Sequence, residues 1–213
     1  MTNRIAGWIA LVMAMSTLNY AVLLSGSGPP EDVFYRYGTA LGAAIQYGFI
    51  LGLVLVIVYG RRDLLALRRP HSWVTASLQM FGVLLLVYAV AAALSPFLDP
   101  GEEQGLTPDE WDGSRAGAYA ANAVVVVLGA PLVEELLFRG AGFSLLRPLG
   151  ALPAVLIIGL AFAATHGLLE AFPILFAFGA GLAWLRERTG SVYPGMVLHA
   201  VFNAAALVLA VST

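Results

Sequence analysis

The stretch Val133-Glu134-Glu135-Leu136-Leu137-Phe138-Arg139 places two adjacent carboxylates inside a long apolar run. An ionisable residue at membrane depth costs roughly 2.5 to 3.5 kcal/mol on insertion scales, so such a residue usually has a function. Adjacent residues of an α-helix diverge by about 100°, whereas residues four apart lie on one face. We therefore expect Glu135 to pair with Arg139, and Glu134 to face another helix without sharing a partner with Glu135.

Composition places this run in a membrane protein. The chain has 213 residues, of which 60% are hydrophobic and 11% charged, and its mean hydropathy is +0.84. These values are too apolar for a soluble domain of this size. There is no cysteine, which excludes a disulfide framework, a thiolate metal site and a cysteine nucleophile.

The hydropathy pattern predicts an all-α, polytopic transmembrane helix bundle of about seven spans, with the N-terminus inside. Residues 1–213 form a single membrane domain, with accessory spans one to three in 1–115 and a catalytic core of spans four to seven in 116–213. The first span is too long for the apolar part of a cleaved signal peptide, so we expect it to be retained. The predicted spans are Ile5–Leu24, Gly38–Gly60, Ser72–Phe97, Ala116–Leu137, Leu152–Leu169, Phe172–Leu185 and Tyr193–Val211.

Charged residues set the predicted orientation. All eleven basic residues are arginines, and eight of them gather in residues 61–69, 139–147 and 186–188. Six acidic residues occupy 99–112 without a base. The positive-inside rule puts the arginine segments on the cytoplasmic side, with Arg139 at the end of the fourth span, and the acidic loop on the other side. A patch for anionic lipids is an alternative reason for the first arginine cluster.

Two later apolar segments carry further polar side chains: Phe162-Ala-Ala-Thr-His166 and His199-Ala-Val-Phe-Asn203. His199 and Asn203 are four residues apart and share a helix face. Pro131 lies three residues before Glu134, where a proline frees a backbone carbonyl and bends the helix. If the fourth, fifth and seventh helices pack together, the polar side chains of these segments line one cavity beside Glu134.

This set of residues suits peptide hydrolysis. Burial prepares Glu134 to act as a general base that takes a proton from water and passes it to the leaving amine. His166 can hold that water, and His199 and Asn203 can donate hydrogen bonds to an oxyanion. Serine chemistry fits less well, because the serines fall near helix ends or in loops. We interpret Glu135 and Arg139 as structural support and Phe162 as packing beside the site.

The three motifs, in this order on successive apolar helices, resemble the CAAX-protease and bacteriocin-processing family, that is, the type II CAAX prenyl endopeptidases. The motifs are Glu134-Glu135-x-x-x-Arg139, Phe162-x-x-x-His166 and His199-x-x-x-Asn203, and the resemblance covers about residues 116 to 211. It implies an intramembrane endopeptidase whose first glutamate is the catalytic base, with Glu134, His166, His199 and Asn203 as the catalytic residues. The expected substrate is a membrane-associated protein or peptide in the plasma membrane, and no nucleic acid is expected as a partner.

Two other functions compete with this reading. One is a non-catalytic membrane protein, such as a bacteriocin self-immunity factor, and the other is a proton-coupled transporter, since buried glutamates and histidines also form proton relays. The absence of inverted repeats and broken-helix pairs counts against a transporter.

Metal dependence is a separate question. Glu134, His166 and His199 with a water would satisfy a catalytic zinc site. However, the chain has no His-Glu-x-x-His helix and few spare carboxylates to orient the histidines. We therefore favour glutamate catalysis without a metal or other cofactor, and keep zinc as the alternative.

The predicted topology can be tested with reporter fusions. A reporter fused after Arg69 should be cytoplasmic, whereas one within residues 99–112 should not, because the positive-inside rule assigns the two loops to opposite sides. Reporters that are active on the same side at both sites would contradict the seven-span map.

Overall fold

A computed structural model describes residues 1–26, 32–98 and 111–211. This described part contains helices and no strand, which confirms the predicted all-α class. Short 3-10 turns at Val33–Tyr35, Arg62–Leu65, Gly113–Arg115 and Arg147–Leu149 flank or join the helices. The helices are α1 (Thr2–Leu24), α2 (Tyr37–Ile57), α3 (Trp73–Leu94), α5 (Ala116–Val124), α6 (Ala130–Glu134), α7 (Phe143–Leu146), α8 (Ala151–Ala164), α9 (Phe172–Thr189) and α10 (Tyr193–Ala210).

α5, α6 and α7 form one continuous helix of 37 residues, Gly113–Leu149, which we call the central helix. Two π-helical segments, Val125–Gly129 and Glu135–Gly142, interrupt its α-helical pattern. The predicted end of the fourth span at Leu137 is therefore wrong, and the helix runs about three turns further. Arg139 is not at a helix end as predicted, and its side chain is completely buried in the bundle.

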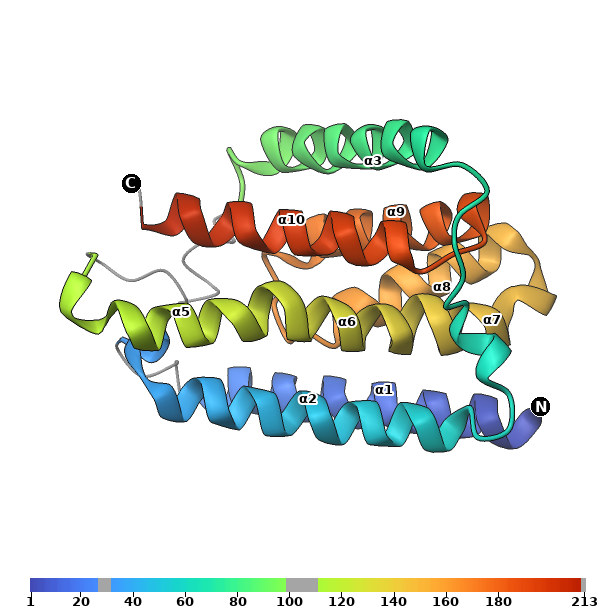
Figure 1. Cartoon of the computed structure of the whole chain (residues 1–213), viewed down its shortest axis with the longest axis horizontal. Coiled ribbons are helices and arrows are strands. Elements are labelled where there is room, and N and C mark those ends of the chain that lie inside the picture. Colours follow the sequence, from blue (N-terminus) through green and yellow to red (C-terminus); the bar gives the residue numbers. More distant parts are fainter. Residues whose placement is uncertain (27–31, 99–110, 212–213) are drawn as a thin grey trace.

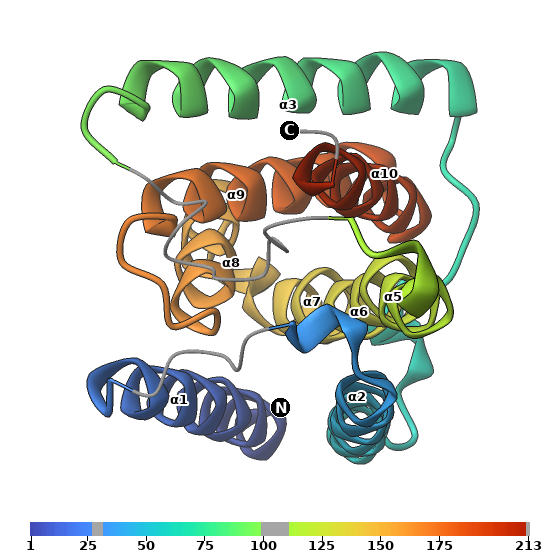
Figure 2. The same cartoon turned by 90° about the vertical axis from the view of Figure 1, so that its left-hand side faces the viewer.

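The other helices surround the central helix. Figure 1 shows α1 and α2 on one side of it and α8, α9 and α10 on the other. α3 is the outermost helix and packs mainly on α9. Figure 2 looks along α1, α2 and α10 but shows α3 and α9 largely from the side, so α3 runs along α9 and crosses α10 at a steep angle. The central helix thus contacts both halves of the bundle.

Helix lengths and exposed side chains agree with a membrane location. Within residues 1–26, 32–98 and 111–211, four helices are long and apolar enough to cross a membrane: α1, α2, α3 and the central helix. α8 and α10 are also apolar but shorter. Many large apolar side chains of α1, α2 and α3 point outward, among them Leu18, Phe49 and Leu78. Such contiguous apolar surface is unfavourable in water and suits contact with lipid.

The bundle has two chemically different ends. Figure 1 shows the N-terminus at the end where α2, the central helix and α9 finish. Most arginines lie at this end, which we call the arginine-rich end: Arg4, Arg61, Arg62, Arg68, Arg69, Arg147, Arg186 and Arg188. At the opposite end Arg115 pairs with Asp32 and Asp112. The predicted acidic loop lies mostly outside the described residues, and the side of the membrane that each end faces stays a prediction.

Backbone chemistry explains where the last helices stop. α9 is capped by Gly190, whose φ of 69° lies in the left-handed region that favours glycine. The N–H of Gly190 donates to Arg186 O at 3.0 Å. α10 then begins with Pro194 in its first turn. α8 ends at Ala164, so the predicted fifth span to Leu169 is too long. Because of this earlier end, His166 lies in the turn after α8 instead of on the helix.

Candidate active site

Pro131 removes one backbone hydrogen bond from the central helix. In the first π-helical segment the N–H of Ala130 donates to Val125 O, five residues earlier. The N–H of residue 131 would bond Val126 O in the same way, but proline has no N–H. Asn203 Nδ2 of α10 donates to Val126 O instead, at 2.9 Å. The carbonyl that Pro131 was expected to free is therefore satisfied by a residue of the candidate site.

Glu135 and Arg139 form the predicted ion pair, with 2.8 Å between Arg139 Nη1 and Glu135 Oε1 and both side chains fully buried. Arg139 Nη2 also donates to Gly179 O of α9 at 2.9 Å, and the guanidinium lies 4.4 Å from the centre of the Phe162 ring. A side chain at position 195 would collide with Glu135 Oε2, so Gly195 allows α10 to pack directly against this carboxylate. The pair thus joins the central helix to α9 and α10.

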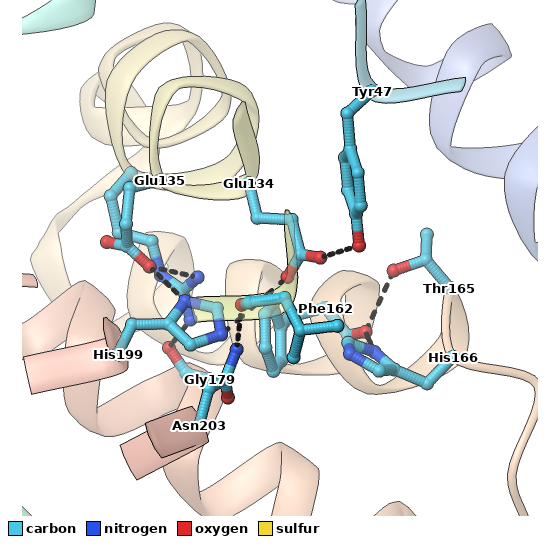
Figure 3. Close-up of polar contacts among 11 residues, drawn as sticks. Tyr47, Glu134, Glu135, Phe162, Thr165, His166, Gly179, His199 and Asn203 are labelled. Atoms are coloured by element: carbon cyan, nitrogen blue, oxygen red, sulfur yellow. Dashed lines mark hydrogen bonds and ion pairs between the residues drawn. The ribbon is translucent and has the colours of Figure 1, made fainter. Parts of the chain in front are cut away.

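His199 lies between the two glutamates (Figure 3). Its Nδ1 donates to Glu135 Oε1 at 3.3 Å, and its Nε2 lies 3.9 Å from Glu134 Oε2. The expectation that Glu134 and Glu135 cannot share a partner is therefore wrong. The carboxylates diverge around the helix as predicted, but the two nitrogens of an imidazole lie on different edges of the ring and can reach one carboxylate each.

Glu134 is 9% exposed and has a different set of contacts. Its Oε1 accepts a hydrogen bond of 3.0 Å from Tyr47 Oη, whereas its buried Oε2 has no hydrogen-bond partner in the described part of the chain. The 3.9 Å gap from Oε2 to His199 Nε2 is longer than a hydrogen bond. Glu134 Oε2 and His199 Nε2 therefore remain available to a third group, such as a water or a substrate atom.

Tyr47 was not predicted as a site residue. It belongs to α2, in the part of the chain predicted as accessory, and is 87 residues from Glu134 in sequence. Its one signal in the sequence is its position in the middle of an apolar span, because membrane tyrosines are enriched at the interfaces. That signal does not name a partner, so only the packing of α2 on the central helix identifies Tyr47.

His166 lies on the other side of Phe162 from His199. The Phe162 ring is 4.6 Å from the His166 ring and 5.8 Å from the His199 ring, centre to centre. His166 Nδ1 donates to Phe162 O at 2.7 Å. A carbonyl only accepts, so the proton is on Nδ1, and Nε2 of the neutral ring is left as an acceptor. His166 can therefore accept a hydrogen bond from water, but it makes no ion pair with Glu134.

The predicted residues thus fall into two groups. Glu134, Glu135, Arg139 and His199 form one connected cluster against Phe162, whereas His166 and Asn203 flank it and bond to backbone carbonyls. Among the described residues no group of three or more histidine, aspartate or glutamate side chains is placed to hold a metal ion. Glu134, His166 and His199 therefore do not converge as three zinc ligands in this arrangement.

The buried ion pair yields a stability prediction. Glu135→Gln should lower the free energy of unfolding by roughly 3 to 5 kcal/mol, because it leaves Arg139 charged and buried without its partner. Adding Arg139→Gln should recover part of this loss, but not the bond to Gly179 O. Thermal and denaturant unfolding of the purified variants in detergent measures both effects.

The matched control is Asp32→Asn, which removes the carboxylate of the exposed pair with Arg115. This change should cost about 1 kcal/mol or less, since exposed pairs contribute little. If Glu135→Gln were as stable as Asp32→Asn, the ion pair would not support the fold.

Comparison with known proteins identifies the part of the chain that builds this site. Residues 116–205 match the family model described as type II CAAX prenyl endopeptidase Rce1-like. No curated protein and no solved structure matches the chain. The matched segment runs from α5 into α10 and includes both glutamates, both histidines and Asn203, whereas Tyr47 lies outside it. The segment that carries the polar cluster is thus similar to the Rce1-like type II CAAX prenyl endopeptidases, the family that the sequence motifs resemble.

Proposed function

We propose that this protein is an intramembrane endopeptidase that hydrolyses peptide bonds of membrane-associated proteins or peptides, with Glu134 as the general base. The family match supports a membrane protease of the CAAX type. The observation that carries the finer proposal is the asymmetry of Glu134, since Tyr47 binds one carboxylate oxygen and the other is buried with no hydrogen-bond partner among the described residues. A carboxylate held in this way is oriented and still has a lone pair for a proton.

The proposed reaction begins with a water beside Glu134 Oε2. Glu134 takes a proton from this water as its oxygen attacks the carbonyl carbon of the substrate, which gives a tetrahedral intermediate and an oxyanion. When the C–N bond breaks, Glu134 returns the proton to the leaving amine. His166 Nε2, as an acceptor, helps to hold the water, and Tyr47 fixes the orientation of the Glu134 carboxylate.

His199 and Asn203 stabilise the oxyanion in this proposal. Asn203 Nδ2 uses one N–H for Val126 O, so its second N–H is left to donate. His199 already donates from Nδ1 to Glu135, so Nε2 can donate only when the ring carries both protons. The role therefore requires an imidazolium at position 199, and Glu135 is the carboxylate that compensates its charge. Preorganised donors of this kind typically contribute 10²- to 10³-fold in rate.

The proposed location is the plasma membrane, where the chain is a multi-pass protein whose arginine-rich end faces the cytoplasm. Support comes from the gathering of Arg4, Arg147 and the 61–69 cluster at one end of the bundle.

Replacing the base should separate activity from stability. Glu134→Gln keeps the size of the side chain and its bond to Tyr47 but removes the proton acceptor, so proteolysis should fall by about 10² to 10⁴ with little change in melting temperature. Cleavage of peptides or membrane proteins by the purified chain in detergent or vesicles measures this. The same assay separates a protease from a self-immunity factor or a transporter, neither of which cleaves a substrate.

Two variants serve as references for this measurement. Glu170→Gln removes the same charge from an exposed position and should leave the rate unchanged. Tyr47→Phe removes only the hydroxyl that binds Glu134 and should reduce the rate less than Glu134→Gln does. If Glu134→Gln stays active while a folded Glu135→Gln is inactive, the base and the supporting carboxylate must be exchanged.

We further propose that catalysis needs no metal ion or other cofactor. The proposal is supported by the contacts of the histidines, since His166 Nδ1 and His199 Nδ1 are bound to different partners and the rings lie on opposite sides of Phe162. Activity should therefore persist after treatment with a strong chelator. Stoichiometric zinc in active protein, with activity lost on chelation and restored by zinc, would overturn the proposal.

A further inference from the structure

A second cluster of charged side chains lies at the arginine-rich end, away from the candidate active site. There the end of the central helix, the end of α9 and the link from α2 to α3 meet (Figure 1). They enclose a pocket of about 380 Å³. Its charged and aromatic lining residues are Asp63, Arg68, Phe143, Arg147, Arg186 and Glu187.

Both carboxylates of this pocket are already bound by arginines. Asp63 accepts two hydrogen bonds of 3.0 Å from Arg61. Glu187 accepts two from Arg147, at 2.8 and 2.7 Å. These fork-like pairs use both oxygens of each carboxylate. Two arginines of the pocket, Arg68 and Arg186, therefore form no ion pair with a described carboxylate.

Arg186 is the more unusual of the two. Arg186 is only 9% exposed. Among the described residues its buried Nε has no hydrogen-bond partner, and its guanidinium forms no ion pair. The ring of Phe143 lies 5.7 Å from the guanidinium carbon of Arg186. Burying an arginine without an anion is unfavourable, and Arg68 adds a second positive charge nearby. Arg68 itself uses its Nε to donate to Gly190 O at 2.6 Å and keeps its other N–H groups.

Two exposed tryptophans indicate the level at which the pocket lies relative to the membrane. Trp184 lies two residues before Arg186 on α9, and Trp73 begins α3 at the same end of the bundle; they are 40% and 45% exposed. Tryptophans with exposed rings are enriched at the level of the lipid headgroups. The pocket therefore lies where phosphate groups of a bilayer and anions of the aqueous phase can both reach it.

We propose that Arg68 and Arg186 form a binding site for one phosphate-type oxyanion at the arginine-rich end. Guanidinium groups match the geometry of phosphate oxygens with pairs of N–H donors, and two arginines that no described carboxylate binds supply the charge that one phosphate requires. The oxyanion is the phosphate of an anionic lipid headgroup or free phosphate, which share this chemistry. Such a ligand would join the ends of the central helix and α9 to the link between α2 and α3. The site is independent of proteolysis.

Thermal unfolding of the purified full-length chain tests the site, because a ligand that binds the folded state raises the melting temperature. One arm compares micelles or nanodiscs that contain phosphatidylglycerol with those that contain phosphatidylcholine. The other arm compares inorganic phosphate with chloride at equal ionic strength. We expect phosphatidylglycerol to raise the melting temperature of the unchanged chain. A rise with inorganic phosphate as well would identify free phosphate as a second source.

Arg186→Gln should weaken the apparent affinity roughly tenfold or more, because hydrogen bonds to charged groups are lost. The matched control is Arg188→Gln, which removes the same charge from an exposed position two residues along α9 and should respond like the unchanged chain. Without ligand, Arg186→Gln should be at least as stable as the unchanged chain, because an unpaired buried charge has been removed.

Arg68→Gln provides a second variant, since Arg68 is exposed and its replacement leaves the buried core intact. It should also lose the ligand-dependent rise in melting temperature. The proposal is overturned if neither ligand stabilises the unchanged chain, or if Arg186→Gln and Arg68→Gln respond to the ligands as Arg188→Gln does.

Discussion

The fully buried ion pair between Glu135 and Arg139 is the interaction on which the rest of this structure depends. A single charge of this kind inside a helix bundle would be strongly unfavourable, and even a pair is tolerated only when further hydrogen bonds compensate the loss of water. Here the compensation comes from other helices, because Arg139 also bonds Gly179 O and Glu135 also contacts His199. The central helix, α9 and α10 must therefore pack closely for the pair to form, and the pair in turn fixes His199.

Pro131 provides a second constraint of the same kind. It lies inside a membrane helix and removes one backbone donor, so a neighbouring group must satisfy the carbonyl that is freed. The π-helical segment before it directs Val126 O toward α10, where Asn203 donates to it. An irregular helix and a polar side chain thus compensate each other, and Asn203 is held one turn from His199. In the proposed reaction this contact orients the amide that meets the oxyanion.

The two adjacent glutamates differ in their partners, although both are at least nine-tenths buried. Glu135 is bound by a permanent cation and by a histidine, which favours a fixed charge. Glu134 has one neutral donor, Tyr47, and one oxygen that no described residue hydrogen-bonds. A carboxylate that must gain and lose a proton during catalysis needs this incomplete set of contacts. The packing of α2, more than burial itself, therefore distinguishes the proposed base from its neighbour.

The sequence by itself determined the features that depend on local patterns. The length of apolar runs predicted a helical membrane bundle, the i,i+4 spacing predicted the Glu135–Arg139 pair, and Pro131 predicted a freed carbonyl. Only the tertiary structure decided that the central helix continues past Arg139, that Tyr47 binds Glu134, and that His199 reaches both carboxylates. These contacts join residues 64 to 87 positions apart. They depend on how separate helices pack, and no local rule of charge or periodicity encodes that packing.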